Sequence, residues 1–206
     1  MTFEERLTTL DALWSVWAEH GSALTDDQWR RPTRLDTWDV RSLYAHHGAW
    51  PFMLTHFLGQ VRDTAPTHTA ASLLRAFNAP DGVAHTRRDT VADGARADAE
   101  KYSTAQMLGQ FTEVGPQAIK TARALGPVAV DYLGVAVLDL GEALSIGIME
   151  ATVHLLDLQR ALGVEPRVPQ AGLAHTAALL AGIAPRVDFV EAATGRRAPD
   201  FFPLLT

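Results

Sequence analysis

The chain has no cysteine among its 206 residues. It therefore forms no disulfide, has no cysteine nucleophile and offers no thiolate to a metal. Any metal must be held by histidine, aspartate or glutamate side chains. Any thiol that takes part in chemistry must arrive on a small molecule.

Other signals are missing as well. No basic run occurs and the formal net charge is −6, which argues against nucleic acid and anionic membranes as partners. The longest apolar stretches carry Glu, His or Asp, so none is predicted to span a membrane. The N-terminal MTFEERLTTL lacks the layout of a secretory signal, and a cytoplasmic location is expected. Neither a Gly-rich phosphate loop, a Gly-x-Ser-x-Gly motif, a Ser-His-Asp arrangement nor an internal repeat is evident.

Apolar residues instead recur at helical spacing along most of the chain. Hydrophobic residues make up 47% of the sequence, enough for one domain with a sizeable core. The pattern predicts five helices, at residues 3–21, 39–62, 90–125, 141–162 and 169–183. A short helix over 70–77 is predicted between the second and the third. This predicts an all-α fold, a four-helix bundle with additional short helices, in which residues 1–165 form the bundle and residues 166–206 a C-terminal helical extension packed on the same domain.

Several segments are less regular. Residues 25–38 are predicted to form a loop with local turns. Pro51 predicts a kink or a break in its helix, because proline removes one amide donor and clashes with the preceding turn. A further interruption is expected at 115–116, and the run 128–140 fits either a short strand or the entry to the next helix. The polar tail ends in FFPLL, which is expected to pack back on the body.

A narrow charged stripe crosses the most apolar predicted helix. Glu150, His154 and Asp157 stand at i, i+4 and i+7, so they share one face. A helix that is apolar over most of its circumference is buried, and a buried carboxylate or imidazole needs a partner or a metal. Glu-x-x-x-His is a spacing at which two side chains can hold one ion. A buried ion pair or a hydrogen-bonded core histidine explains the same spacing.

A third candidate ligand lies on another helix. His46 falls on the inward stripe of the helix over 39–62, and a His2Glu set leaves a fourth position open, as catalytic zinc sites do. His47 points about 100° away from His46, so only one of them can face the ion and the other is expected at the surface or in a loop contact. Asp157 is expected to orient a ligand imidazole, or to pair with Arg160 or with an arginine on a neighbouring helix.

Other candidates are weaker. Asp81 and His85 repeat the carboxylate–histidine spacing, but the proline and glycine around them make a regular helix unfavourable. Trp38, just ahead of the second long helix, is a candidate wall of a substrate pocket, although core packing explains a tryptophan equally well. The remaining histidines have no partner in register and are interpreted as ordinary side chains: His20, His56, His68 and His175.

Two stretches resemble a known family. LTDDQWRRPTRLDTWDVRSLYAHHGAW and EATVHLLDLQRALG are similar to the two signatures of the mycothiol-dependent maleylpyruvate isomerase N-terminal domain family, within the DinB-like superfamily. In the first signature a metal-binding histidine follows the tryptophan by eight residues, which selects His46 over His47. The resemblance implies a DinB-like bundle and a divalent metal, usually zinc, held by His46, Glu150 and His154. It also implies a thiol cosubstrate, typically the mycothiol of actinobacteria, and suggests a homodimer.

One departure bears on function. The isomerase that the chain resembles carries a further C-terminal domain, whereas only a short stretch follows Gly163 here. The leading hypothesis is a transferase or isomerase in which a metal-activated thiolate attacks an electrophilic small molecule. The alternatives are a non-catalytic bundle that binds a small molecule or a protein partner and keeps the His/Glu cluster as a structural site, and a metal-dependent hydrolase.

Overall fold

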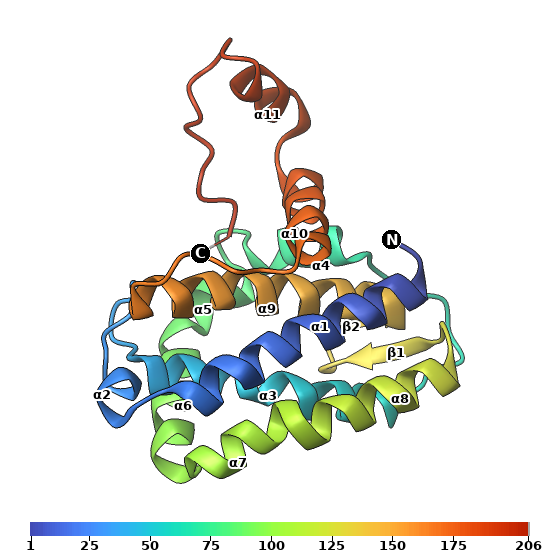
Figure 1. Ribbon diagram of the computed structural model, residues 1–206. Helices are drawn as coiled ribbons and strands as arrows, with labels where there is room; N and C mark the ends of the chain where they lie inside the picture. The colour runs from blue at the N-terminus through green and yellow to red at the C-terminus, as the bar shows by residue number, and fades with distance from the viewer. Residues whose placement is uncertain (206) are drawn as a thin grey trace.

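Four long, roughly aligned helical segments form the body of this computed structural model, which describes residues 1–205 (Figure 1). The members are α1 (Phe3–Ala23), α3 (Val40–Leu58), α8 (Gly115–Leu125) and α9 (Leu140–Leu162). Each buries an apolar stripe against its neighbours, and the core is centred on Leu7, Leu13, Leu43, Leu144 and Ile148. The predicted all-α bundle is confirmed. No helix of the described residues is both long enough and apolar enough to cross a membrane.

The helix ends follow local sequence signals. Thr2 caps α1, its hydroxyl accepting from the Glu5 amide while the Glu5 carboxylate accepts from the Thr2 amide. Asp39 caps α3, and Gly163 ends α9 in the left-handed region with a φ of 70°. These ends agree with the prediction to within a few residues. Pro51 lies inside α3 without breaking it, so the predicted break is absent.

The predicted helix over 90–125 is wrong as a single element. The chain forms α6 (Arg88–Lys101), then α7 (Thr104–Gly109), a π-helical turn η1 (Gln110–Val114) and finally α8. Ser103 separates α6 from α7 because its hydroxyl accepts from the Gln106 amide and starts a new helix. The expected interruption at 115–116 corresponds to the end of η1.

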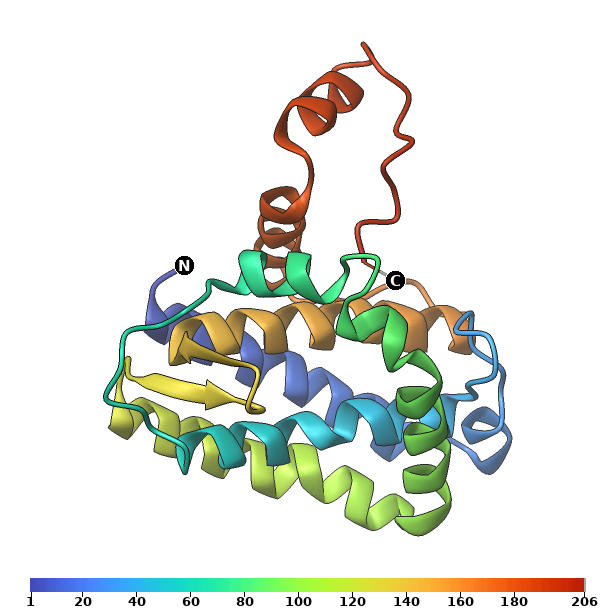
Figure 2. The same ribbon diagram turned by 180° about the vertical axis from the view of Figure 1, so that it is seen from behind.

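Short elements cover the bundle. They are α2 (Asp26–Trp29), within the predicted loop, and α4 (Ala70–Phe77), α5 (Val83–Thr86), β1 (Ala129–Tyr132) and β2 (Ala136–Asp139). The two strands pair antiparallel, so the ambiguous run 128–140 is a hairpin that leads into α9. Figure 2 shows α6 crossing the bundle and α4 lying along α9. This places α4, α5 and α6 around one side of α3 and α9.

The C-terminal part leaves the bundle and returns. α10 (Gln170–Ile183) packs against α1, α4 and α9, whereas α11 (Arg186–Ala193) has no buried residue and projects away from the body (Figure 1). The tail then comes back toward the bundle. Of the FFPLL motif, Phe202 stays 52% exposed and Leu205 packs against the core. The expected return of this segment to the body therefore holds at its end.

Candidate metal centre

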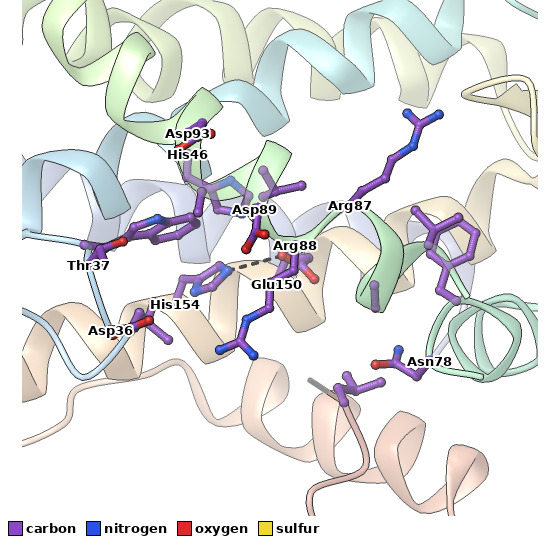
Figure 3. A pocket seen from close by; sticks show the side chains of 18 of the residues that line it. Asp36, Thr37, His46, Asn78, Arg87, Arg88, Asp89, Asp93, Glu150 and His154 are labelled. Atoms are coloured by element: carbon purple, nitrogen blue, oxygen red, sulfur yellow. Dashed lines mark ion pairs between the residues drawn. The ribbon is translucent and has the colours of Figure 1, made fainter. Parts of the chain in front are cut away.

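Three side chains with metal-binding chemistry meet on one side of the bundle. His46 comes from α3, and Glu150 and His154 come from α9. Each offers one ligand atom, and the three atoms lie within 4.8 Å of one another. Figure 3 shows the three side chains in one part of the pocket, with the ion pair between Glu150 and His154 dashed. Residues 104 positions apart in the chain therefore lie close together.

The charged face of α9 forms a connected row. His154 Nε2 lies 3.4 Å from Glu150 Oε2, and His154 Nδ1 lies 3.0 Å from Asp157 Oδ2. When the ring is neutral, the bond to Asp157 places its proton on Nδ1 and leaves the lone pair of Nε2 on the side of Glu150. Asp157 also accepts from Arg34 Nε at 2.6 Å. Asp157 thus contacts the His154 imidazole, and its arginine partner is Arg34 from a loop, neither Arg160 nor an arginine on a neighbouring helix.

His46 is kept neutral. Its ring lies 4.7 Å from the ring of Trp38 and 5.2 Å from that of His154, measured between centroids. Burial lowers the pKa of His46 to about 4, and the neighbouring His154 acts in the same direction. A neutral imidazole is the form that binds metals.

His154 has the opposite electrostatics. Burial lowers its pKa, but the hydrogen bonds to Asp157 and Glu150 outweigh burial and raise the pKa to about 9. Burial also opposes the charged form of Glu150 and so raises its pKa. The hydrogen bond to His154 has the opposite effect, and the pKa of Glu150 stays below its ordinary value. The buried Asp157 and the partly buried Glu150 thus favour a positive charge between them, which a proton on His154 provides when no other cation is present.

His47 is the main correction to the predicted site. It was expected at the surface or in a loop contact, but it is fully buried. Its ring lies 4.5 Å from Trp17 and 5.6 Å from Phe111 between centroids, and neither ring nitrogen has a hydrogen-bond partner within residues 1–205. Burial holds the pKa of His47 well below its ordinary value. The sequence could not reveal this, because Trp17 and Phe111 belong to other helices.

The three candidate ligands open on a cavity of about 840 Å³. Trp38 lines it and is 9% exposed. One wall is apolar and comes from α4, α5 and the C-terminal tail: Leu74, Phe77, Val83, Ala84 and Leu205. Another is charged, with residues of both signs, and comes from α6, the residue before it and the loop before α3: Arg34, Arg87, Arg88, Arg96, Asp36, Asp89 and Asp93. The cavity therefore suits a small molecule with both an apolar and a polar part.

Sequence reasoning missed the arginines of the charged wall. Arg87 and Arg88 are adjacent, and the signal that could have found them is a pair of arginines just before a helix start. Their side chains form no ion pair within the described residues, whereas Arg96 pairs with Asp93. Figure 3 shows Arg88 on the side of His154 and Arg87 pointing away from it.

The weaker candidates lie elsewhere. Asp81 and His85 are not part of the three-residue group. His20, interpreted as an ordinary side chain, contacts the amide of Gln159 through Nε2 at 2.9 Å. Burial lowers the pKa of His20 and that of His175.

Comparisons with known proteins agree with this arrangement. The family profile described as the mycothiol maleylpyruvate isomerase N-terminal domain matches residues 10–159, a span that includes all three candidate ligands. No curated protein matches the chain.

Two solved structures share the fold. One is a histidine-to-alanine mutant of the mycothiol-dependent maleylpyruvate isomerase, with a TM-score of 0.58 and 16% identity. The other is a crystal structure of the same isomerase without a stated mutation, with a TM-score of 0.56 and 15% identity. Each alignment covers 87% of this chain and 70% of the isomerase chain.

Proposed function

The chain belongs to the mycothiol maleylpyruvate isomerase N-terminal domain family, and from that membership we propose that it is a metal-dependent, thiol-dependent transferase or isomerase. The proposed metal ligands are His46, Glu150 and His154. The observation that carries the proposal is the convergence of these three side chains from two helices on one wall of a cavity.

The residues present fit a divalent metal such as zinc. Two imidazole nitrogens and one carboxylate oxygen are a donor set that zinc accepts in sites with an open position. Burial keeps His46 neutral, and no residue of the described chain forms a hydrogen bond with its ring nitrogens. A cation held here would lower the pKa of a coordinated thiol and so supply thiolate at neutral pH.

The chain's own residues then have three tasks. Asp157 holds the Nδ1 proton of His154 and thereby keeps Nε2 directed at the ligand position. Trp38 and the apolar wall exclude water from one side of the cavity. Arg88 offers a cation to an anionic group of the second substrate, and we propose that the electrophile carries one.

The thiol has to be a cosubstrate, since the chain has no cysteine. We propose mycothiol in this role, on the strength of family membership. The thiolate sulfur would add to one carbon of an activated carbon–carbon double bond, and the π electron pair would move to the conjugated electron-withdrawing group. Protonation of the adduct gives a thiol conjugate. Rotation about the former double bond, followed by loss of the thiolate and return of the electron pair, gives an isomer of the second substrate.

A metal titration tests the first step. Wild-type protein is expected to bind one equivalent of zinc, and His46→Ala to bind it far more weakly. His56→Ala is the matched control, because His56 lies exposed on the same helix. Equal binding by wild type and His46→Ala would contradict the proposed site.

A thiol assay tests the second step. Zinc-loaded protein is incubated with mycothiol and with N-ethylmaleimide, a chloronitrobenzene or maleate, and the rate is compared with that of mycothiol alone. Acceleration that is lost in His46→Ala supports the transferase or isomerase. Tight zinc binding without acceleration across this panel would instead favour the metal as a structural link between α3 and α9.

A further inference from the structure

The loop between α2 and α3, residues 30–39, is held in one conformation by hydrogen bonds of its own backbone and side chains. Pro32 and Asp39 pair across its base. Within it, the amide and the hydroxyl of Thr33 both donate to the carbonyl of Trp38, at 2.9 and 2.8 Å. These internal bonds fix the backbone of loop 30–39 and therefore the positions from which its side chains extend.

Loop 30–39 reaches α9 at two points. Arg31 Nη1 donates to the carbonyl of Leu162 at 3.0 Å, and Arg34 Nε donates to Asp157 Oδ1 at 2.6 Å. The Asp157 side chain is only 3% exposed, and its other oxygen contacts His154 Nδ1. A continuous line of contacts thus runs from Arg34 through a buried carboxylate to a proposed metal ligand.

The same loop also touches the ligand histidine of α3. The Trp38 ring lies 4.7 Å from the His46 ring and 6.3 Å from the His154 ring between centroids. Loop 30–39 therefore reaches both imidazoles. Trp38 contacts the His46 ring directly, and Arg34 is linked to the His154 ring through Asp157.

We propose that loop 30–39 aligns both ligand histidines, and that Arg34 is the positioning residue for His154. This inference rests on the metal site proposed above. Arg34 acts by holding Asp157 in the orientation that fixes the His154 ring. Asp157 would otherwise keep one buried oxygen without a partner and could turn away from the imidazole.

Two effects of Arg34 on a bound cation oppose each other. Its positive charge repels the cation, and its hydrogen bond to Asp157 orients a ligand for that cation. The Arg34 side chain is 57% exposed, so water screens the repulsion. The hydrogen bond ends on a buried carboxylate and is not screened in this way. Orientation therefore outweighs repulsion, and loss of Arg34 should weaken metal binding.

Zinc affinity, measured by competition with a chromophoric chelator, tests the proposal. Arg34→Met is expected to lower the affinity about tenfold, the lower end of the range for residues that orient metal ligands. Arg34→Lys keeps the charge without the planar fork and should fall between Arg34→Met and wild type. Arg30→Met is the matched control, because Arg30 lies in the same loop and, among residues 1–205, pairs only with exposed Asp27. An affinity of Arg34→Met equal to that of Arg30→Met overturns the proposal.

A measurement on metal-free protein separates this role from mere stabilisation. The His154 Nδ1 proton should give a slowly exchanging ring signal in histidine-labelled NMR spectra of wild type and Arg30→Met, and the signal should be lost in Arg34→Met. An arginine that only stabilises the fold would lower the free energy of unfolding but leave both the signal and the zinc affinity of the folded protein unchanged.

The two proposals fail separately. If wild-type protein binds no zinc, the proposed function fails, and the NMR comparison alone decides whether Arg34 positions His154. If wild type binds zinc and Arg34→Met binds it equally well, only the role of Arg34 is refuted.

Discussion

Alkaline pH should destabilise the metal-free protein through one side chain, His154. Its pKa rises from 6.5 to about 9 on folding, because the bonds to Asp157 and Glu150 outweigh burial. A raised folded-state pKa contributes stability that is complete below about pH 6.5 and is lost as the pH rises through about 9. The expected sign is therefore a fall in the free energy of unfolding between these two values.

The size of the fall follows from the same shift. At about 1.36 kcal/mol per pKa unit, moving from 6.5 to about 9 corresponds to about 3 kcal/mol. The attraction that raises the pKa of His154 also lowers the pKa of Glu150 and Asp157, so it is counted once. His154 is 15% exposed, and solvent screening of the interaction is modest.

Urea unfolding of chelator-treated protein over this pH range measures the effect. His154→Gln removes the titrating group, so its free energy of unfolding should fall much less over this range. The remaining fall in this variant measures the contribution of all other titrating groups. Zinc-saturated wild type should lack the decline as well, because the metal replaces the proton. Parallel curves for metal-free wild type and His154→Gln would refute the reasoning.

Two further predictions concern the cavity and the core. Arg88→Ala should raise the KM for an anionic electrophile and leave the KM for a neutral one unchanged, whereas Arg87→Ala should change neither, since Arg87 points away from His154; equal effects of the two variants would count against Arg88 as the cationic binding group. Gly21→Ala should lower the free energy of unfolding by about 1–3 kcal/mol, because the added carbon would lie 2.3 Å from the buried hydroxyl of Tyr44. Gly94→Ala, where the added carbon meets nothing within 4 Å, should be neutral or stabilising by up to about 1 kcal/mol, and a similar loss for both glycine variants would contradict the packing argument.

Features that depend on neighbouring residues, such as the positions and ends of helices, could largely be predicted from the sequence. The helix over 141–162 has an apolar stripe, a charged face and a terminal Gly163, and it appears with nearly these bounds. The helix over 90–125 failed because apolar periodicity continues across a new helix start. The signal was present at Ser103, whose capping box with Gln106 begins α7.

Contacts between segments distant in the chain could not be predicted from the sequence. The proposed ligands could be selected because Glu150 and His154 share one helix face and His46 lies on the inward stripe of another helix. The family resemblance then selected His46 over His47. The burial of His47 depends on Trp17 and Phe111, and the bond between Arg34 and Asp157 spans 123 positions. No spacing rule links such pairs, since only the packing of the helices brings them together.

The position of Leu205 has a practical consequence. This residue lines the cavity and is the last one before the C-terminal Thr206. An affinity tag or a fluorescent protein fused to the C-terminus is therefore joined close in sequence to a residue of the cavity wall. The N-terminus lies apart from the returning C-terminal tail (Figure 1). Fusions made there should leave ligand entry undisturbed.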